Sequence, residues 1–155
     1  MGAMATTWLT PSEMKAWRNF IESVNTLTAA LESDLVPFGL TMGDYEVLVR
    51  LSEADDERMR MCDLATALQL SPSGLTRRLD GLVSTGLVER VANPSDRRVM
   101  FAALTAKGRA KLAAAAPDHV ASVRNRFFKG LTHEQVRELG SIFETVRVNL
   151  GACPQ

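Results

Sequence analysis

Two pairs of adjacent arginines are the residues of this sequence best suited to binding a charged or polar ligand. Arg77 and Arg78 lie shortly after a Ser-Pro-Ser-Gly segment, and Arg97 and Arg98 follow an Asn-Pro-Ser-Asp segment. A guanidinium group presents five donors in a planar fork, which matches the acceptors of a guanine edge or of a phosphate. We therefore consider nucleic acid first as the ligand.

The charges of the chain are unevenly distributed although the formal net charge is zero. Residues 12–57 contain three cations and ten anions, a net charge of −7, whereas residues 58–111 contain ten cations and four anions, a net charge of +6. A basic segment beside an acidic one is typical of a protein in which one lobe meets phosphates. Both arginine pairs lie in the basic segment, which favours nucleic acid as their partner.

The elements that must position the arginines are mostly helices, because apolar residues recur at helical spacing along the chain. Ser71 is a typical N-cap and Pro72 a typical first helical residue, so Arg77 and Arg78 fall in a helix, away from its apolar stripe. The predicted helices cover residues 10–37, 41 to the acidic run at 55–57, 61–68, 72–85 with Gly86 as the stop, 105 to about 130 with an end or kink at Pro117, and 132–150.

The other arginine pair falls in a predicted β-hairpin. Residues 87–91 and 98–104 read as strands, and the turn cluster between them places Asp96, Arg97 and Arg98 at the hairpin tip. This order of helices and strands is that of a winged helix-turn-helix. The predicted fold is mainly α with a small β-hairpin wing, flanked by helical dimerisation arms because the terminal helices carry apolar faces that the lobe cannot cover.

A winged helix-turn-helix offers two surfaces to duplex DNA. Its second paired helix enters the major groove, and the leading residues of that helix contact base edges. Arg77 is the best candidate to bind a guanine with two hydrogen bonds, and Arg78 shares this role or binds a phosphate. A wing arginine suits the minor groove, with Asp96 orienting it through paired hydrogen bonds. The leading residues expected near the duplex are Ser71, Ser73, Gly74, Thr76 and Arg77.

The segment from Asp96 to Thr105 resembles the wing signature of the MarR family of bacterial regulators, which is Asp, any residue, Arg, five residues, Leu-Thr. By this resemblance Arg98 enters the minor groove, Asp96 holds it, and Arg97 binds a phosphate. Residues 61–90 resemble the paired helices of that family, with Leu64-Ala65, Leu75-Thr76-Arg77 and Gly86-Leu87-Val88 as the matching segments.

The resemblance implies an obligate homodimer that binds an imperfect palindrome in double-stranded DNA. It implies a single domain over residues 10–150, with residues 41–105 as the DNA-binding lobe and residues 10–38 and 106–150 as dimerisation helices. Residues 1–9 are expected to be a tail, in part a remnant of cloning in front of a native Met4.

Regulators that resemble the MarR family are often repressors, released from DNA by small aromatic or phenolic acids that bind between the arms and the DNA lobe. On this resemblance, Trp17, Phe20 and Tyr45 are candidate walls of a ligand pocket, and Arg18 is a weak candidate for its cation. A large ring at such positions is more often part of a core, and both interpretations stay open.

Two other functions also stay open. Cys62 is either the centre of a thiol-based oxidant sensor that still binds DNA or a small buried residue. The second is a winged-helix module that binds protein instead of DNA, which the two arginine pairs disfavour.

Catalysis has little support in the sequence. His119 and His133 have no nucleophile or carboxylate at a motif spacing, and a glycine-rich phosphate loop is missing. Cys62 and Cys153 make neither a disulfide framework nor a metal site and fit a reducing cytoplasm. Apolar runs stay short of the ~18 residues of a membrane span. We therefore expect no enzyme, cofactor, metal or membrane span.

Overall fold

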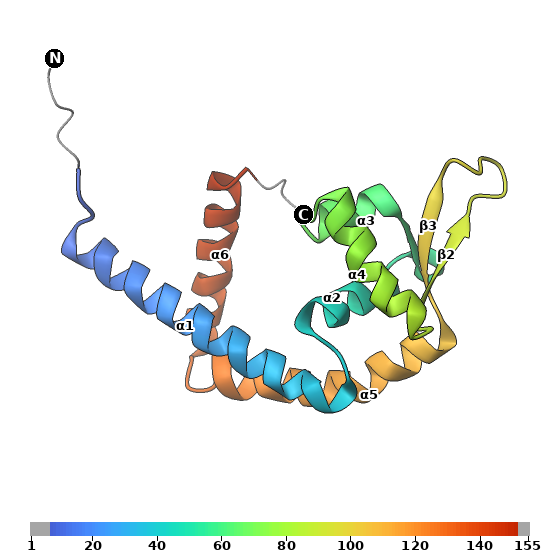
Figure 1. Cartoon of the computed structure of the whole chain (residues 1–155). Coiled ribbons are helices and arrows are strands. Elements are labelled where there is room, and N and C mark those ends of the chain that lie inside the picture. Colours follow the sequence, from blue (N-terminus) through green and yellow to red (C-terminus); the bar gives the residue numbers. More distant parts are fainter. Residues whose placement is uncertain (1–6, 152–155) are drawn as a thin grey trace, which may run out of the picture. The chain divides into compact units, whose positions relative to one another are not determined.

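The computed structural model describes residues 7–151, which are mostly helical (Figure 1). The expectation for a tail at residues 1–9 falls mainly outside this range, as does Cys153. The chain divides between His119 and Val120 into two compact units. The predicted fold class, helical with a small β-wing, is confirmed.

Helix α1, Pro11–Leu35, begins with the capping box expected from the sequence. Thr10 accepts a hydrogen bond from the backbone of Glu13, and the Glu13 carboxylate accepts one from the Thr10 backbone. Leu31 and Leu35 at its C-terminal end are buried, whereas Trp17 and Phe20 nearer the start are exposed. A 3₁₀ turn, Val36–Phe38, and Gly39 with φ of 67° end the helix.

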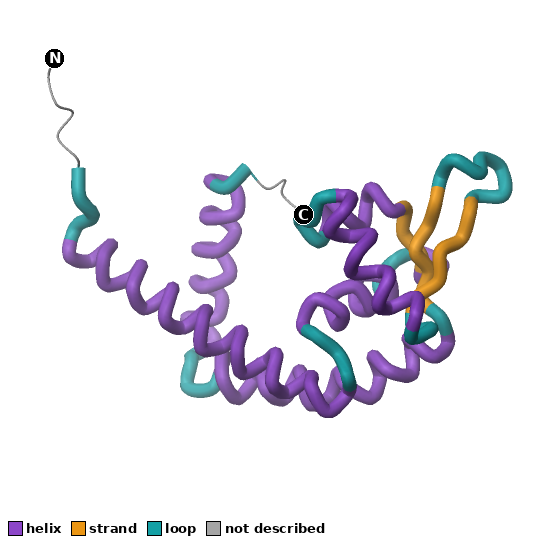
Figure 2. Tube along the Cα trace, viewed as in Figure 1, coloured by secondary structure: helices purple, strands orange, loops and turns teal. Residues whose placement is uncertain are grey.

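The lobe that the sequence analysis placed at residues 41–105 consists of three helices and a three-stranded sheet. The helices are α2, Met42–Ser52, α3, Met61–Ala67, and α4, Pro72–Ser84. The strands are β1, Arg58–Arg60, β2, Val88–Ala92, and β3, Met100–Leu104, in the antiparallel order β1-β3-β2. Figure 2 shows the strands in orange and the loop at the end of the β2–β3 hairpin in teal.

The strand β1 was missed by the sequence analysis. Its Arg-Met-Arg sequence is too short to show an alternating pattern, and β3, the strand with which it pairs, lies more than forty residues later. It follows a turn in which Asp56 and Glu57 adopt left-handed φ values of 52° and 51°. Arg109 donates hydrogen bonds to both carboxylate oxygens of Glu57, which fastens this turn to α5.

One apolar core joins the helices of the lobe to its sheet. Leu75, Leu79 and Leu82 line the inner face of α4, as the periodicity predicted. They pack with buried residues from the neighbouring elements. The other core residues are Leu35, Leu40, Tyr45, Val47, Leu48, Leu51, Leu64, Ala65, Leu87, Val88, Ala102, Leu104 and Ala115.

The C-terminal part of the chain is helical. Helix α5, Ala106–Val123, continues through Pro117, so the alternative in which the helix ends there is wrong. A π-helical turn, Arg124–Phe128, leads to Gly130, and Thr132 caps α6, His133–Asn149. Large apolar side chains of α6 lie on its surface, namely Val136, Ile142, Val146 and Val148.

Candidate nucleic-acid interface

The leading end of α4 is built by its cap. The Ser71 hydroxyl accepts a hydrogen bond of 3.1 Å from the backbone N–H of Gly74, and the Thr76 hydroxyl donates one of 2.9 Å to the Pro72 carbonyl. Ser71, Ser73 and Thr76 are exposed, and Gly74 is half-buried. The small residues predicted to approach DNA therefore lie together at the start of α4.

The two arginines of α4 separate in the structure. Arg77 is exposed, as an arginine that contacts a ligand must be. Arg78 is half-buried, and its guanidinium occupies the space that a Cβ on Gly43 of α2 would take. Both arginines were expected to lie away from the apolar stripe of α4; Arg77 is open to solvent, and Arg78 lies beside α2.

The wing tip is shaped by Asp96. The expectation was that its carboxylate orients an arginine through paired hydrogen bonds. In the structure it accepts a hydrogen bond of 3.0 Å from the backbone N–H of Arg98, while the Asp96 carbonyl accepts one of 2.9 Å from Val99. Asp96 therefore acts on Arg98 through the turn of the backbone. Asp96, Arg97 and Arg98 are all exposed.

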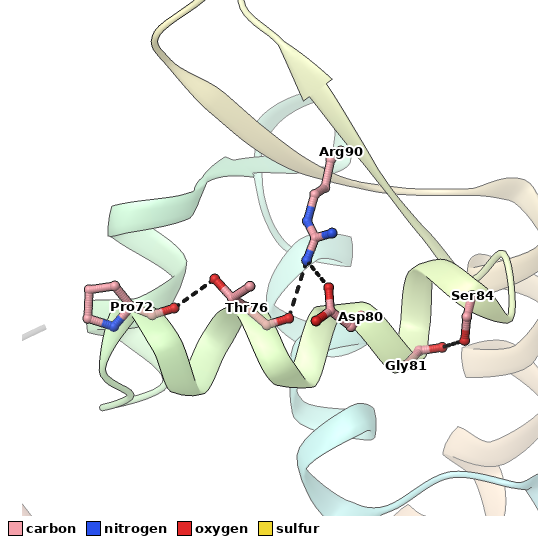
Figure 3. Close-up of polar contacts among 6 residues, drawn as sticks. All are labelled: Pro72, Thr76, Asp80, Gly81, Ser84 and Arg90. Atoms are coloured by element: carbon pink, nitrogen blue, oxygen red, sulfur yellow. Dashed lines mark hydrogen bonds and ion pairs between the residues drawn. The ribbon is translucent and has the colours of Figure 1, made fainter.

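Arg90 connects the wing to α4, a role that the sequence analysis missed. Its guanidinium donates hydrogen bonds of 2.7 Å to the Asp80 carboxylate and 3.2 Å to the Thr76 carbonyl (Figure 3). The contact joins β2 to the middle of α4 and so limits how far the wing can turn relative to that helix. Opposite charges at positions 80 and 90 were the available sequence signal.

The C-terminal end of α4 is fastened to the start of α5. The Thr105 hydroxyl lies 2.7 Å from the Gly86 carbonyl, and the Lys107 ammonium donates a hydrogen bond of 2.6 Å to the Thr85 carbonyl. These contacts satisfy carbonyls that the end of a helix leaves open. Gly108 faces the Leu87 carbonyl so closely that a side chain would not fit.

A cavity of about 710 Å³ lies beside the lobe. Tyr45 lines it, but Trp17 and Phe20 do not, and the rings of these two contact each other on α1 at a centroid distance of 6.0 Å. The three candidate pocket residues are therefore not brought together. The full lining is Leu31, Met42, Tyr45, Glu46, Val49, Arg50, Glu53, Ala67, Leu68, Gln69 and His119.

Arg50 and His119 are cavity residues that the sequence analysis missed. Arg50 is half-buried, whereas Glu46 and Glu53 on the same helix are exposed. The imidazole of His119 contacts the Tyr45 ring at a centroid distance of 4.4 Å, and its Nδ1 is buried without a hydrogen-bond partner. Burial lowers the pKa of His119, although the negative charge of Asp34 acts in the opposite direction and raises it. Burial raises the pKa of Tyr45. The cavity thus combines one cation, Arg50, and two exposed carboxylates, Glu46 and Glu53, with the polar rings of Tyr45 and His119.

The lowered pKa of His119 predicts that the stability of the protein depends on pH. The pKa of His119 is lowered in the native state from the ordinary histidine value of 6.5. Below that pH, the imidazole therefore binds a proton more readily in the unfolded chain than in the native state. The free energy of unfolding is therefore expected to fall as the pH is lowered from 7 to 5. A His119→Gln variant should show a shallower fall in urea titrations at each pH, and a slope equal to that of the parent would contradict this assignment.

Cys62 is exposed, so the interpretation as a small buried residue is wrong. Its thiol lies 3.5 Å from the carboxylate of Asp63. Reactive cysteines are set beside cations, so this neighbour does not favour a sensor role. Within residues 7–151, no cluster of three or more His, Cys, Asp or Glu side chains is arranged to hold a metal.

The profile of the MarR family matches residues 40–100, which span α2 to the start of β3. AbsC, a MarR family transcriptional regulator from Streptomyces coelicolor, is 46% identical with a TM-score of 0.90, over 94% of this chain and 98% of AbsC. The chain belongs to the MarR family. Sco3205, a second MarR family regulator from that organism, solved in complex with DNA, is 36% identical with a TM-score of 0.89, over 96% of this chain and 93% of Sco3205.

A relative known by sequence agrees with this membership. The transcriptional repressor YetL from Bacillus subtilis is 30% identical over 114 residues, which are 71% of this chain and 68% of YetL. As a member of the MarR family, the chain is a transcriptional regulator that binds DNA. None of the helices in residues 7–151 is both long and apolar enough to cross a membrane.

Proposed function

We propose that the protein is a cytoplasmic homodimeric repressor that recognises an imperfect palindrome with α4 and the wing. The observation that carries this proposal is the pairing of two exposed basic tips, Arg77 on α4 and Arg97 with Arg98 on the wing, joined by the bond from Arg90 to Asp80. A helix tip and a hairpin tip held together suit a major groove and the adjacent minor groove. A dimer seated on such a site would exclude other proteins from that DNA.

Exposed apolar side chains support the homodimer. Helix α1 exposes Trp17, Phe20, Ile21 and Val24, and helix α6 exposes Val136, Ile142, Val146 and Val148. Soluble monomers rarely leave large apolar patches open to water, so a second copy is the expected cover. Two-fold symmetry would then place the two copies of α4 about 34–36 Å apart, one turn of DNA.

The test is selection of DNA from a random duplex library, followed by fluorescence anisotropy with the selected sequence over a range of salt concentrations. The parent is expected to select a two-fold symmetric site, and light scattering should show a dimer. Arg98→Ala should weaken binding to all sequences alike and flatten the salt dependence by about one unit per lost contact, two per dimer. Failure to select any sequence would contradict the proposed function.

We also propose that the cavity binds a small aromatic acid that releases the protein from DNA. Arg50 would pair with the carboxylate, and Tyr45 and His119 would offer an aromatic wall with a free Nδ1 for a phenolic hydroxyl. A volume of about 710 Å³ suits a ligand with one or two rings.

Salicylate is a suitable probe for this site. It is expected to raise the melting temperature of the parent and to weaken its binding to the selected duplex. Arg50→Ala should reduce both effects several-fold, because the carboxylate loses its charged partner. Arg18→Ala removes an exposed arginine of α1 outside the cavity and serves as the matched control. Equal losses in the two variants would contradict the assignment of Arg50.

A further inference from the structure

We propose that Arg78 is a positioning residue that seats the recognition helix α4 on α2, and that it acts on DNA binding through this contact. The inference rests on the proposed DNA-binding function and concerns how the same interface is held. Arg78 follows Arg77 directly, so the two side chains leave the helix about 100° apart. Arg77 remains exposed, whereas Arg78 is half-buried against α2.

Gly43 makes this seat possible. A Cβ at position 43 would coincide with the guanidinium of Arg78, so any larger residue there would displace that guanidinium from its place against α2. Gly43 lies in the first turn of α2, inside a helix that glycine weakens. By contrast, a Cβ on Gly81 of α4 would meet open space. Gly43 thus gives the Arg78 guanidinium room against α2, whereas Gly81 gives room to no neighbour.

The first turn of α2 is itself held in place from other sides. The Glu32 carboxylate of α1 accepts a hydrogen bond of 2.8 Å from the Met42 backbone N–H, and Asp44 completes a capping box with Thr41. Met42 and Tyr45 on either side of Gly43 line the cavity. Arg78 thus lies against the first turn of α2, which is also bonded to α1 and lines the cavity.

The test is a double-mutant cycle of Gly43→Ala and Arg78→Ala, read by anisotropy with the selected duplex. Each single change is expected to weaken binding by about twofold to thirtyfold, the usual range for residues that act without touching the ligand. The double variant should bind no worse than the weaker-binding single variant, because both changes remove one contact. Gly81→Ala adds the same methyl group in open space and serves as the matched control.

Salt dependence separates positioning from direct contact with DNA. Arg78→Ala should leave the slope of log Kd against log salt unchanged, and Arg78→Met, which keeps the long stem, should recover part of the affinity. Melting temperatures close to that of the parent would show that folding is intact. Additive effects in the cycle, or a slope reduced by about two units per dimer, would overturn the inference. Either result requires a parent that binds DNA, so it leaves the proposed function standing.

Discussion

Arg77→Ala is expected to weaken binding to the selected duplex by at least about 30-fold. A bidentate arginine–guanine contact contributes about 1–3 kcal/mol of discrimination, and a homodimer carries the contact twice, which gives about 2–6 kcal/mol. The loss should fall on one base pair of each half-site, because only that position is read by Arg77. Repeating the selection with the variant should therefore give sequences relaxed at that position alone.

The matched control for this prediction is Ser84→Ala on the same helix. The Ser84 hydroxyl is bonded to the Gly81 carbonyl of its own helix at 2.8 Å, near the end opposite the cap (Figure 3). Its removal should leave both affinity and base preference as in the parent. An Arg77→Ala variant that binds like the parent, with the same selected sequence, would refute the assignment of Arg77 to a base.

Leu79→Ala, two residues further along α4, is expected to act on folding instead. Leu79 is fully buried in the lobe core, and truncation of such a leucine costs about 2–5 kcal/mol through lost burial and the cavity left behind. Urea titrations at a fixed protein concentration should show the midpoint falling accordingly. Binding per folded molecule should change far less than in Arg77→Ala.

The conservative variant Leu79→Met keeps the volume of the side chain. It should cost less than about 1.5 kcal/mol, because a flexible thioether fills the same space. A Leu79→Ala variant as stable as the parent would show that α4 is not seated on the core as described. The two predictions thus separate the outer face of one helix from its inner face.

The parts of the fold that depend on local chemistry were predictable from the sequence. The caps at Thr10, Ser71 and Thr132 and the stop at Gly86 each involve residues within a few positions of one another. Such contacts leave a signature in neighbouring residue types. The buried stripe of α4 was predictable for the same reason, since its spacing is set by the helix itself.

The parts that were missed depend on residues far apart in the chain. The strand β1 exists only through β3, and the seat of Arg78 exists only because Gly43 meets it across the lobe. The cavity is similar, since Arg50 and His119 lie on different helices and share no motif. Aromatic residue type alone suggested Trp17 and Phe20, but the fold places these on the exposed face of α1. The type of a side chain does not reveal which other side chains the fold will place beside it.

The junction between α4 and α5 has a consequence for how the protein could respond to a signal. Thr105 and Lys107 form hydrogen bonds with the carbonyls of Gly86 and Thr85, just after α4. Gly108 leaves room for the close approach of the Leu87 carbonyl. Because these contacts hold the first turn of α5 against the residues that follow α4, we expect α4 and the start of α5 to move as one body. A displacement of the start of α5 would then shift α4 as well, and with it the exposed Arg77 that we assign to a base contact.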